Sequence, residues 1–113
     1  MALTQLAGPV IQAGASLSDA LDCTAGRIVR FFTPPAWTGS NVTFQLSFDG
    51  VTWANLLNRS GAEIVAAVKP NSVIILTEYA GQIAHIKIRS GTAAAPVVQA
   101  ARRDFKTIIE KNA

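Results

Sequence analysis

The side chains able to perform catalysis or hold a metal ion are few in this sequence. It has one histidine, His85, one cysteine, Cys23, and seven acidic residues spread over 113 positions. Nucleophilic catalysis needs a base within reach of the nucleophile, and a zinc site needs several converging His, Cys or carboxylate ligands. Neither CxxC, HExxH, GxSxG nor a phosphate-binding loop occurs. The sequence therefore predicts a protein that is not an enzyme and that uses no cofactor or metal ion.

Cys23 and His85 both have plain structural interpretations. Cys23 has no second cysteine to pair with, and its neighbours Asp22 and Thr24 would not activate a thiol, so we expect a buried or half-buried apolar side chain. His85 lies in an alternating strand pattern, so we expect it to face solvent or a partner instead of acting as a catalytic base.

Basic side chains form the one charge pattern that could bind a partner. Residues 82–89 alternate between apolar side chains on one face and His85, Lys87 and Arg89 on the other, and Arg27 and Arg30 could join them. This stripe is either an ordinary solvated sheet face or a docking face for an acidic protein surface. Nucleic acid ranks third, because the aromatic residues that would stack on bases occupy apolar positions.

Trp37 is the aromatic residue that we expect to be most exposed, because it follows Pro34-Pro35 in a predicted loop. It could stack on a sugar or bind a partner, but capping the open end of a sandwich is the commoner use of such a tryptophan.

Short apolar segments separated by Gly, Pro, Asn and Asp must position these side chains, and they predict an all-β protein. The predicted strands are residues 27–32, 41–48, 51–57, 62–68, 73–76 and 82–89. Residues 73–76 are apolar on both faces, which is typical of a strand covered twice or placed at a subunit contact. Residues 97–110 fit a helix or a strand, and periodicity alone leaves both open.

The clearest predicted hairpin turns at Asp49-Gly50, residues that suit a tight turn. A two-residue loop would pair Leu46 with Trp53, and a four-residue loop would pair Phe48 with Trp53. Either register buries Phe48 and Trp53 together with Phe44 and Leu46. The first 15 residues carry no strong strand pattern, no signal peptide and no membrane span, so we expect an N-terminal arm over residues 1–15.

Composition adds a hint of assembly. Only 15% of residues are charged, against about 25% in an average globular protein, which suggests that other protein covers part of the surface. The net charge of +3 is too small to argue for nucleic acid by itself.

Five runs of residues resemble a known family when taken together. They are VR at 29–30, PPAWT at 34–38, TFQLSFDGVTWANL at 43–56, IKIRSGT at 86–92 and APVVQAA at 95–101. The pattern spans residues 27–109 and resembles small proteins encoded in the structural gene clusters of tailed bacteriophages and prophages. The resemblance implies a virion component without catalytic residues, and it implies a strand over residues 103–110.

We therefore expect residues 1–113 to form a single antiparallel β-sandwich, jelly-roll-like, of about eight short strands. The expected function is that of a capsid decoration (cement) protein, made in the bacterial cytoplasm and bound between capsid subunits on the virion. The expected partners are the major capsid protein or other virion proteins, with no membrane and no direct nucleic acid. A homotrimer is expected, because a closed ring matches sites of local threefold symmetry.

Two alternatives stay open. The first is a neck or tail protein of the same virion, which would be equally non-enzymatic. The second is a carbohydrate-binding module that uses Trp37 and Trp53, although Trp53 has the parity of a core residue in the predicted hairpin.

Overall fold

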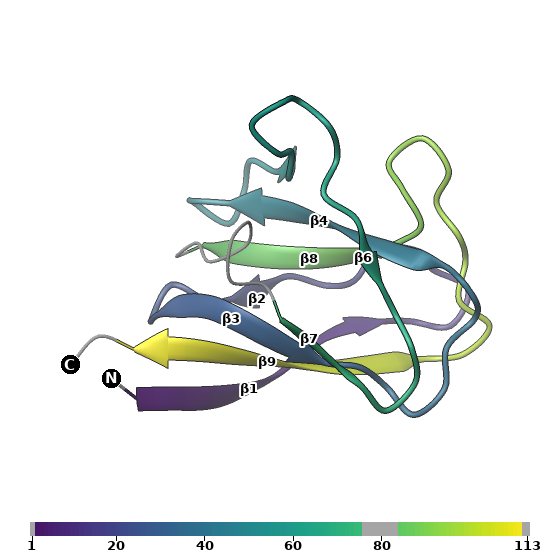
Figure 1. Cartoon of the computed structure of the whole chain (residues 1–113), viewed down its shortest axis with the longest axis horizontal. Helices are drawn as coiled ribbons and strands as arrows, with labels where there is room; N and C mark the ends of the chain where they lie inside the picture. Colours follow the sequence, from purple (N-terminus) through teal and green to yellow (C-terminus); the bar gives the residue numbers. More distant parts are fainter. Residues whose placement is uncertain (1, 76–83, 112–113) are drawn as a thin grey trace.

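Two antiparallel sheets face each other in the computed structural model, which describes residues 2–75 and 84–111. The strands are β1 (Ala2–Ile11), β2 (Leu21–Asp22), β3 (Arg27–Phe32), β4 (Asn41–Ser47), β5 (Ala54–Asn55), β6 (Ala66–Ala67), β7 (Val73–Ile75), β8 (His85–Ser90) and β9 (Arg103–Lys111). Figure 1 shows β1, β9, β3 and β7 in one layer, which we call sheet A. Sheet B has the order β2-β8-β4-β5, with β6 also paired to β4. The predicted all-β sandwich is confirmed.

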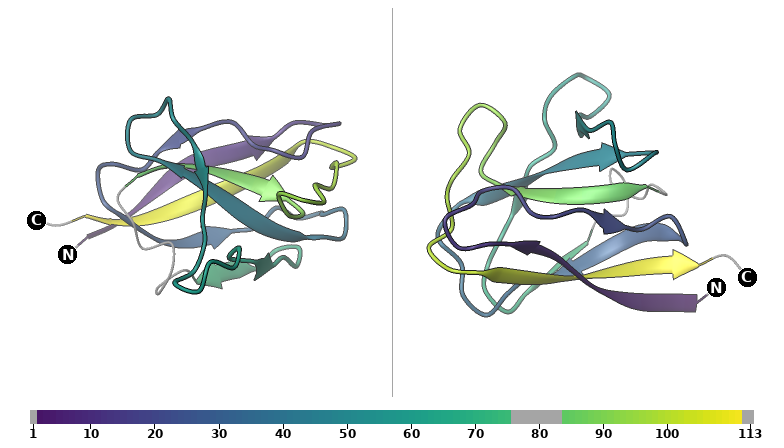
Figure 2. Two further views of the ribbon diagram at one scale, coloured as in Figure 1. Left: turned by 90° about the horizontal axis from the view of Figure 1, so that it is seen from above. Right: turned by 180° about the vertical axis from the view of Figure 1, so that it is seen from behind.

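The strand pairs are nested along the chain. β1 pairs with β9, β2 with β8, β3 with β7, and β4 with both β5 and β6. If β5 and β6 are taken as one strand, the first strand pairs with the last, the second with the second from last, and so on inward to β4. Successive pairs alternate between the two layers, and the view from behind in Figure 2 shows these layers one above the other. This nested, alternating order is that of a jelly roll.

Alternating apolar side chains fill the space between the sheets. Phe31 on β3 stacks against Phe44 on β4, with ring centroids 5.7 Å apart, so these two rings join the sheets directly. The fully buried core side chains are Ile11, Cys23, Ile28, Phe31, Val42, Phe44, Ile86, Ile88, Phe105 and Ile109. No helix that could cross a membrane occurs in the two described ranges.

The first and the last strand, β1 and β9, belong to sheet A. Residues 1–15 were expected to form an arm outside the sandwich, and this is wrong for β1, which pairs with β9 from Ala2↔Lys111 to Ile11↔Arg103. The register shifts between Ala7 and Val10. This bulge, at Gly8-Pro9, interrupts the alternation of period two that would have predicted the strand.

The ambiguous segment 97–110 contains the strand β9 and no helix. Phe105, Thr107 and Ile109 point into the core from β9, as a strand requires. The helical spacing of Val97 and Ala101 is therefore incidental, since both residues precede the strand.

The Asp49-Gly50 turn joins β4 to β5, but neither predicted register is correct. Leu46 pairs with Ala54 and Gln45 with Asn55, so the connecting loop is longer than expected. Phe48 then lies outside the core with 84% of its surface exposed. Trp53 lies on the outer side of sheet B, where its ring contacts Lys87. The reason is that the side chain of Asp49 organises a wide loop with hydrogen bonds that the apolar pattern does not reveal.

Two other predicted strands are shorter than expected. Within residues 62–68 only Ala66–Ala67 forms a strand, β6. Within residues 73–76, Val73–Ile75 forms β7 at the edge of sheet A, and Leu76 lies outside the described residues. β7 is not covered on both faces, because Val73 and Ile75 are exposed.

Candidate docking surface

The basic residues singled out in the sequence lie on two opposite faces of the sandwich. The alternation of β8 is confirmed: Ile86 and Ile88 are buried, and His85, Lys87 and Arg89 lie on the outer face of sheet B. Arg27 and Arg30 belong to β3 and lie on the outer face of sheet A. The structure therefore does not bring these five residues into a single basic surface.

Arg89 is part of the framework of sheet B. Its side chain is largely buried, and its guanidinium donates hydrogen bonds to Glu63 at 3.1 Å and to Asn55 at 2.9 Å. A longer contact of 3.4 Å reaches the hydroxyl of Thr43. Glu63 also accepts from the backbone N–H of Ala93. Arg89 thus ties the 55–63 loop and the 91–96 loop to the sheet, and its charge is used inside the molecule.

Lys87 and His85 also have neighbours within the chain. The ammonium of Lys87 lies 4.5 Å from the centroid of the Trp53 ring, a cation–π contact. Asp22 on β2 is opposite His85. The hydroxyl and the backbone N–H of Thr24 donate to Asp22 and, with the nearby His85, hold the pKa of that carboxyl below its usual value. The outer face of sheet B therefore carries Asp22 beside His85 and Glu63 beside Arg89, so the predicted basic stripe contains charges of both signs.

Trp37 is half-buried and closes one end of the sandwich. Its ring packs edge-on against Phe105, with centroids 5.5 Å apart, and its Nε1–H donates to the carbonyl of Ser40. This is the capping arrangement, so the expectation that Trp37 is the most exposed aromatic residue is wrong. Trp53 has one ring face occupied by Lys87, and the two tryptophans do not form a shared flat platform for a sugar.

Cys23 lacks the exposure and the low pKa that a catalytic thiol needs. It lies fully buried in the core, as expected of an apolar side chain. Burial raises the pKa of the thiol to about 12, and the charge of Asp22 adds to the increase. Among residues 2–75 and 84–111, no three His, Cys, Asp or Glu side chains are grouped as ligands for a metal ion.

The outer face of sheet A differs from that of sheet B. The register of β9, β3 and β7 places outward side chains in two rows across the strands. The rows are Lys106 with Phe32 and Val73, and Ile108 with Arg30 and Ile75. Arg30, Phe32, Val73, Ile75 and Lys106 are at least partly exposed, and we call these five residues the docking face. Two cationic side chains therefore lie among apolar ones on the outer face of sheet A.

Neither cation of the docking face forms an ion pair with another described residue. The ion pairs among the described residues are Arg27–Glu110, Arg89–Glu63 and Arg102–Asp104, and they include neither Arg30 nor Lys106. The Nε of Arg30 is buried and has no hydrogen-bond partner among residues 2–75 and 84–111. Arg27 lies at the end of the same face, but its charge is paired with Glu110 at 3.0 Å.

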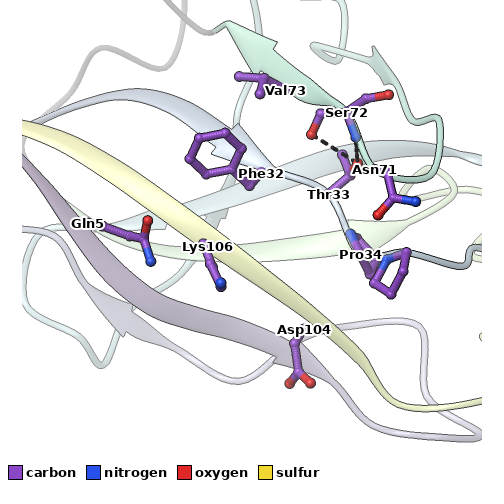
Figure 3. Close-up of a pocket in the computed structure, with 10 residues that line it drawn as sticks. Gln5, Phe32, Thr33, Pro34, Asn71, Ser72, Val73, Asp104 and Lys106 are labelled. Carbon is purple, nitrogen blue, oxygen red and sulfur yellow. Dashed lines mark hydrogen bonds between the residues drawn. The ribbon is translucent and has the colours of Figure 1, made fainter.

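A shallow hollow adjoins the docking face. It has a volume of about 610 Å³ and is lined by Phe32, Val73 and Lys106 together with Gln5, Asp104 and the loop residues around Asn71. Figure 3 shows the ring of Phe32 beside Val73, with Lys106 and Gln5 on the neighbouring strands. Thr33 and Ser72 fix the rim by hydrogen bonds between the Thr33 hydroxyl and the Ser72 backbone. Hydrogen bonds within the protein therefore fix the shape of this hollow.

Sequence reasoning missed the docking face because strands distant in the chain form it. The sequence indicated Arg30 as a candidate docking cation and residues 73–76 as apolar on both strand faces, but nothing in the sequence placed them side by side. Lys106 gave no signal, because residues 97–110 fitted either a helix or a strand. In comparisons with known proteins, no family model, no curated protein and no solved structure matches this chain.

Proposed function

We propose that this protein is a non-enzymatic structural protein of a tailed-bacteriophage particle, a capsid decoration (cement) protein. It binds through the docking face to an acidic surface between capsid subunits and stabilises the assembled head. The observation that carries the proposal is the outer face of sheet A, where two cationic side chains that form no ion pair with another described residue lie among exposed apolar ones. The resemblance of residues 27–109 to phage structural proteins supports the virion as the place of action.

The composition of the docking face fits a protein interface. Exposed apolar side chains gain free energy when a partner removes them from water, at about 25 cal/mol per Å². Ile75 is 67% exposed and Val73 is 46% exposed, so both have surface to lose. Cations beside them favour a partner that carries carboxylates and speed the encounter with it.

Stabilisation of the head follows from linkage. A protein that binds the assembled shell and not the free subunits shifts the equilibrium toward the shell by mass action. A rigid jelly roll suits this role because it loses little conformational entropy when it binds. Homo-oligomers on the particle are part of the proposal.

Localisation in the virion tests this function. We expect the chain to be present in purified particles of the phage that encodes it, and a cryo-electron microscopy map to show sheet A facing the capsid shell. Density for the chain in the neck or tail would make it a structural protein of that part instead. Particles that lack the chain altogether would refute a virion role.

A further inference from the structure

The loop between β4 and β5 carries the two most exposed large apolar side chains among the described residues. Phe48 is 84% exposed and Val51 is 80% exposed. Leu57, at the other end of the same region, is exposed as well. An aromatic side chain presented in this way is typical of an anchor that fills a pocket in a binding partner. We call Phe48, Val51 and Leu57 the Phe48 patch.

The loop is held in one conformation by its own hydrogen bonds. The carboxylate of Asp49 accepts from the backbone N–H groups of Val51 and Thr52, both at 2.8 Å, and from the Ser47 hydroxyl at 2.9 Å. The Ser47 oxygen in turn accepts from the N–H of Gly50. These bonds lower the pKa of Asp49 to about 2, so the carboxylate keeps them at neutral pH. Phe48 is thus presented on a loop that is already ordered, which reduces the entropy lost on binding.

Gly50 fits this loop closely against sheet B. Its φ of 76° lies in the left-handed region, which favours glycine. A Cβ atom there would also lie 3.3 Å from the His85 ring. The loop is therefore held by the hydrogen bonds of Asp49 and lies close against His85 of β8.

A hollow lies directly beside Phe48. It has a volume of about 520 Å³. Its lining combines the apolar residues Leu46, Phe48, Ala54, Leu56 and Leu57 with the polar or charged residues Ser47, Asp49, Thr52 and Asn55. A phenyl ring fits in a far smaller space, since an apolar cavity of about 150 Å³ holds benzene. The patch therefore offers both a projecting ring and a space that can receive one.

The charge of this region favours a second copy of the chain as the occupant. The whole protein carries +3, so two copies repel each other over most of their surface. From Gly50 to Asn58 no residue is charged, and the carboxylate of Asp49 is engaged within the loop. The loop thus carries no cation, and its one anion is already hydrogen-bonded, so two such molecules can meet there without bringing cations together.

We propose that two copies of the protein pair about a twofold axis through the Phe48 patch, each Phe48 ring entering the hollow of the other copy. A twofold contact uses the same patch on both molecules, and here the ring and the hollow belong to one patch. A trimer, which the symmetry of a capsid favours, would need them on different faces of the molecule. The pairing does not depend on the proposed function, because the patch belongs to sheet B and the docking face to sheet A.

The contact is small, so the pairing is weak. Stable interfaces bury about 1,200–2,000 Å² in total, and one loop with its hollow falls below that range. We therefore expect a fast exchange between monomer and dimer in solution. On a surface that carries many copies, the high local concentration would favour the paired state.

Sedimentation velocity over a wide range of protein concentration tests the pairing. We expect the weight-average mass to rise toward that of a dimer. We expect Phe48→Ser to raise the dissociation constant by at least about thirtyfold, because each dimer loses the anchor residue of both copies. Ile75→Ser, a matched control on the opposite sheet, should leave the association unchanged. Both side chains are exposed, so melting curves should confirm that the two variants stay folded.

A second variant tests the hollow. Leu57→Lys places a cation at the rim of the hollow on both copies, and it should abolish the pairing through like-charge repulsion. A wild-type chain that stays monomeric at every concentration would overturn the inference. So would a dimer that survives Phe48→Ser or disappears in Ile75→Ser. Loss of particle binding in Phe48→Ser with a monomeric wild type would assign the patch to the particle instead and would equally overturn it.

Discussion

Replacing Glu63 by alanine would test whether Arg89 stabilises the fold and does not act as a free docking cation. The substitution removes the carboxylate that lies 3.1 Å from the Arg89 guanidinium. Only 10% of the Arg89 side chain and 19% of the Glu63 side chain are exposed, so water replaces the lost partner poorly. A charged side chain deprived of its partner in such a place is destabilising.

The loss of stability in Glu63→Ala depends on the hydrogen bonds that Arg89 keeps. Breaking a fully buried ion pair costs about 3–5 kcal/mol, but Asn55 stays 2.9 Å from Arg89 and the pair is not fully buried. A hydrogen bond to a charged group contributes about 1.5–3 kcal/mol, and the bond from the Ala93 N–H is lost too. We expect Glu63→Ala to reduce the free energy of unfolding by about 2–3 kcal/mol. This corresponds to a fall in melting temperature on the order of 10 °C.

Urea unfolding followed by intrinsic fluorescence and circular dichroism measures this loss. The matched control is Lys87→Ala, two residues before Arg89 and on the same face of β8, which should cost less than about 1 kcal/mol because it removes only a partly exposed cation–π contact. The double variant Arg89→Met with Glu63→Ala should recover part of the loss, since no unpaired charge is left. A Glu63→Ala variant within about 0.5 kcal/mol of the wild type would refute the structural role of Arg89.

Three further predictions follow from the packing and the loop. Phe44→Ala should cost about 3–5 kcal/mol in urea unfolding because it empties the core beside Phe31, whereas Phe48→Ala should cost almost nothing; equal losses would contradict the assigned register. Asp49 should titrate near 2 by NMR, so its hydrogen bonds are fully present above the unfolded value of about 3.9 and are lost as the pH falls through 2; a midpoint near 3.9 would refute the ordered loop. The Cys23 thiol, with its pKa of about 12, should resist a thiol reagent at pH 8 until the protein unfolds, and rapid labelling of the folded protein would contradict its burial.

The sandwich itself could be predicted from the sequence because its longest alternating segments lie in the core. The alternation in β4 and β8 depends on neighbouring residues alone, and it correctly assigned Val42, Phe44, Ile86 and Ile88 to the core. β1 was missed because the bulge at Gly8-Pro9 shifts its register. A local pattern cannot reveal a strand whose two halves are out of phase.

The binding surface was harder to predict, because it depends on contacts between distant parts of the chain. The stripe on β8 was identified, but its charges are engaged by Glu63 and Trp53, which come from loops whose paths the sequence does not give. Arg30 and Lys106 are 76 positions apart and become neighbours only through the pairing of β3 with β9. Phe48 was assigned to the core since its parity is correct for β4, and the hydrogen bonds of Asp49 end the strand one residue earlier.

Binding to particles assembled without this gene is the measurement that tests the central claim most directly. Purified protein would be mixed with such particles, and the bound fraction would be measured by co-sedimentation at several salt concentrations. Lys106→Glu reverses a charge on the docking face, and Lys87→Glu reverses one on the opposite face. We expect Lys106→Glu to bind weakly and Lys87→Glu to bind like the wild type, with partial release of the wild type as salt screens the charges over about 8 Å. Full binding by Lys106→Glu, or a loss confined to Lys87→Glu, would contradict docking through sheet A.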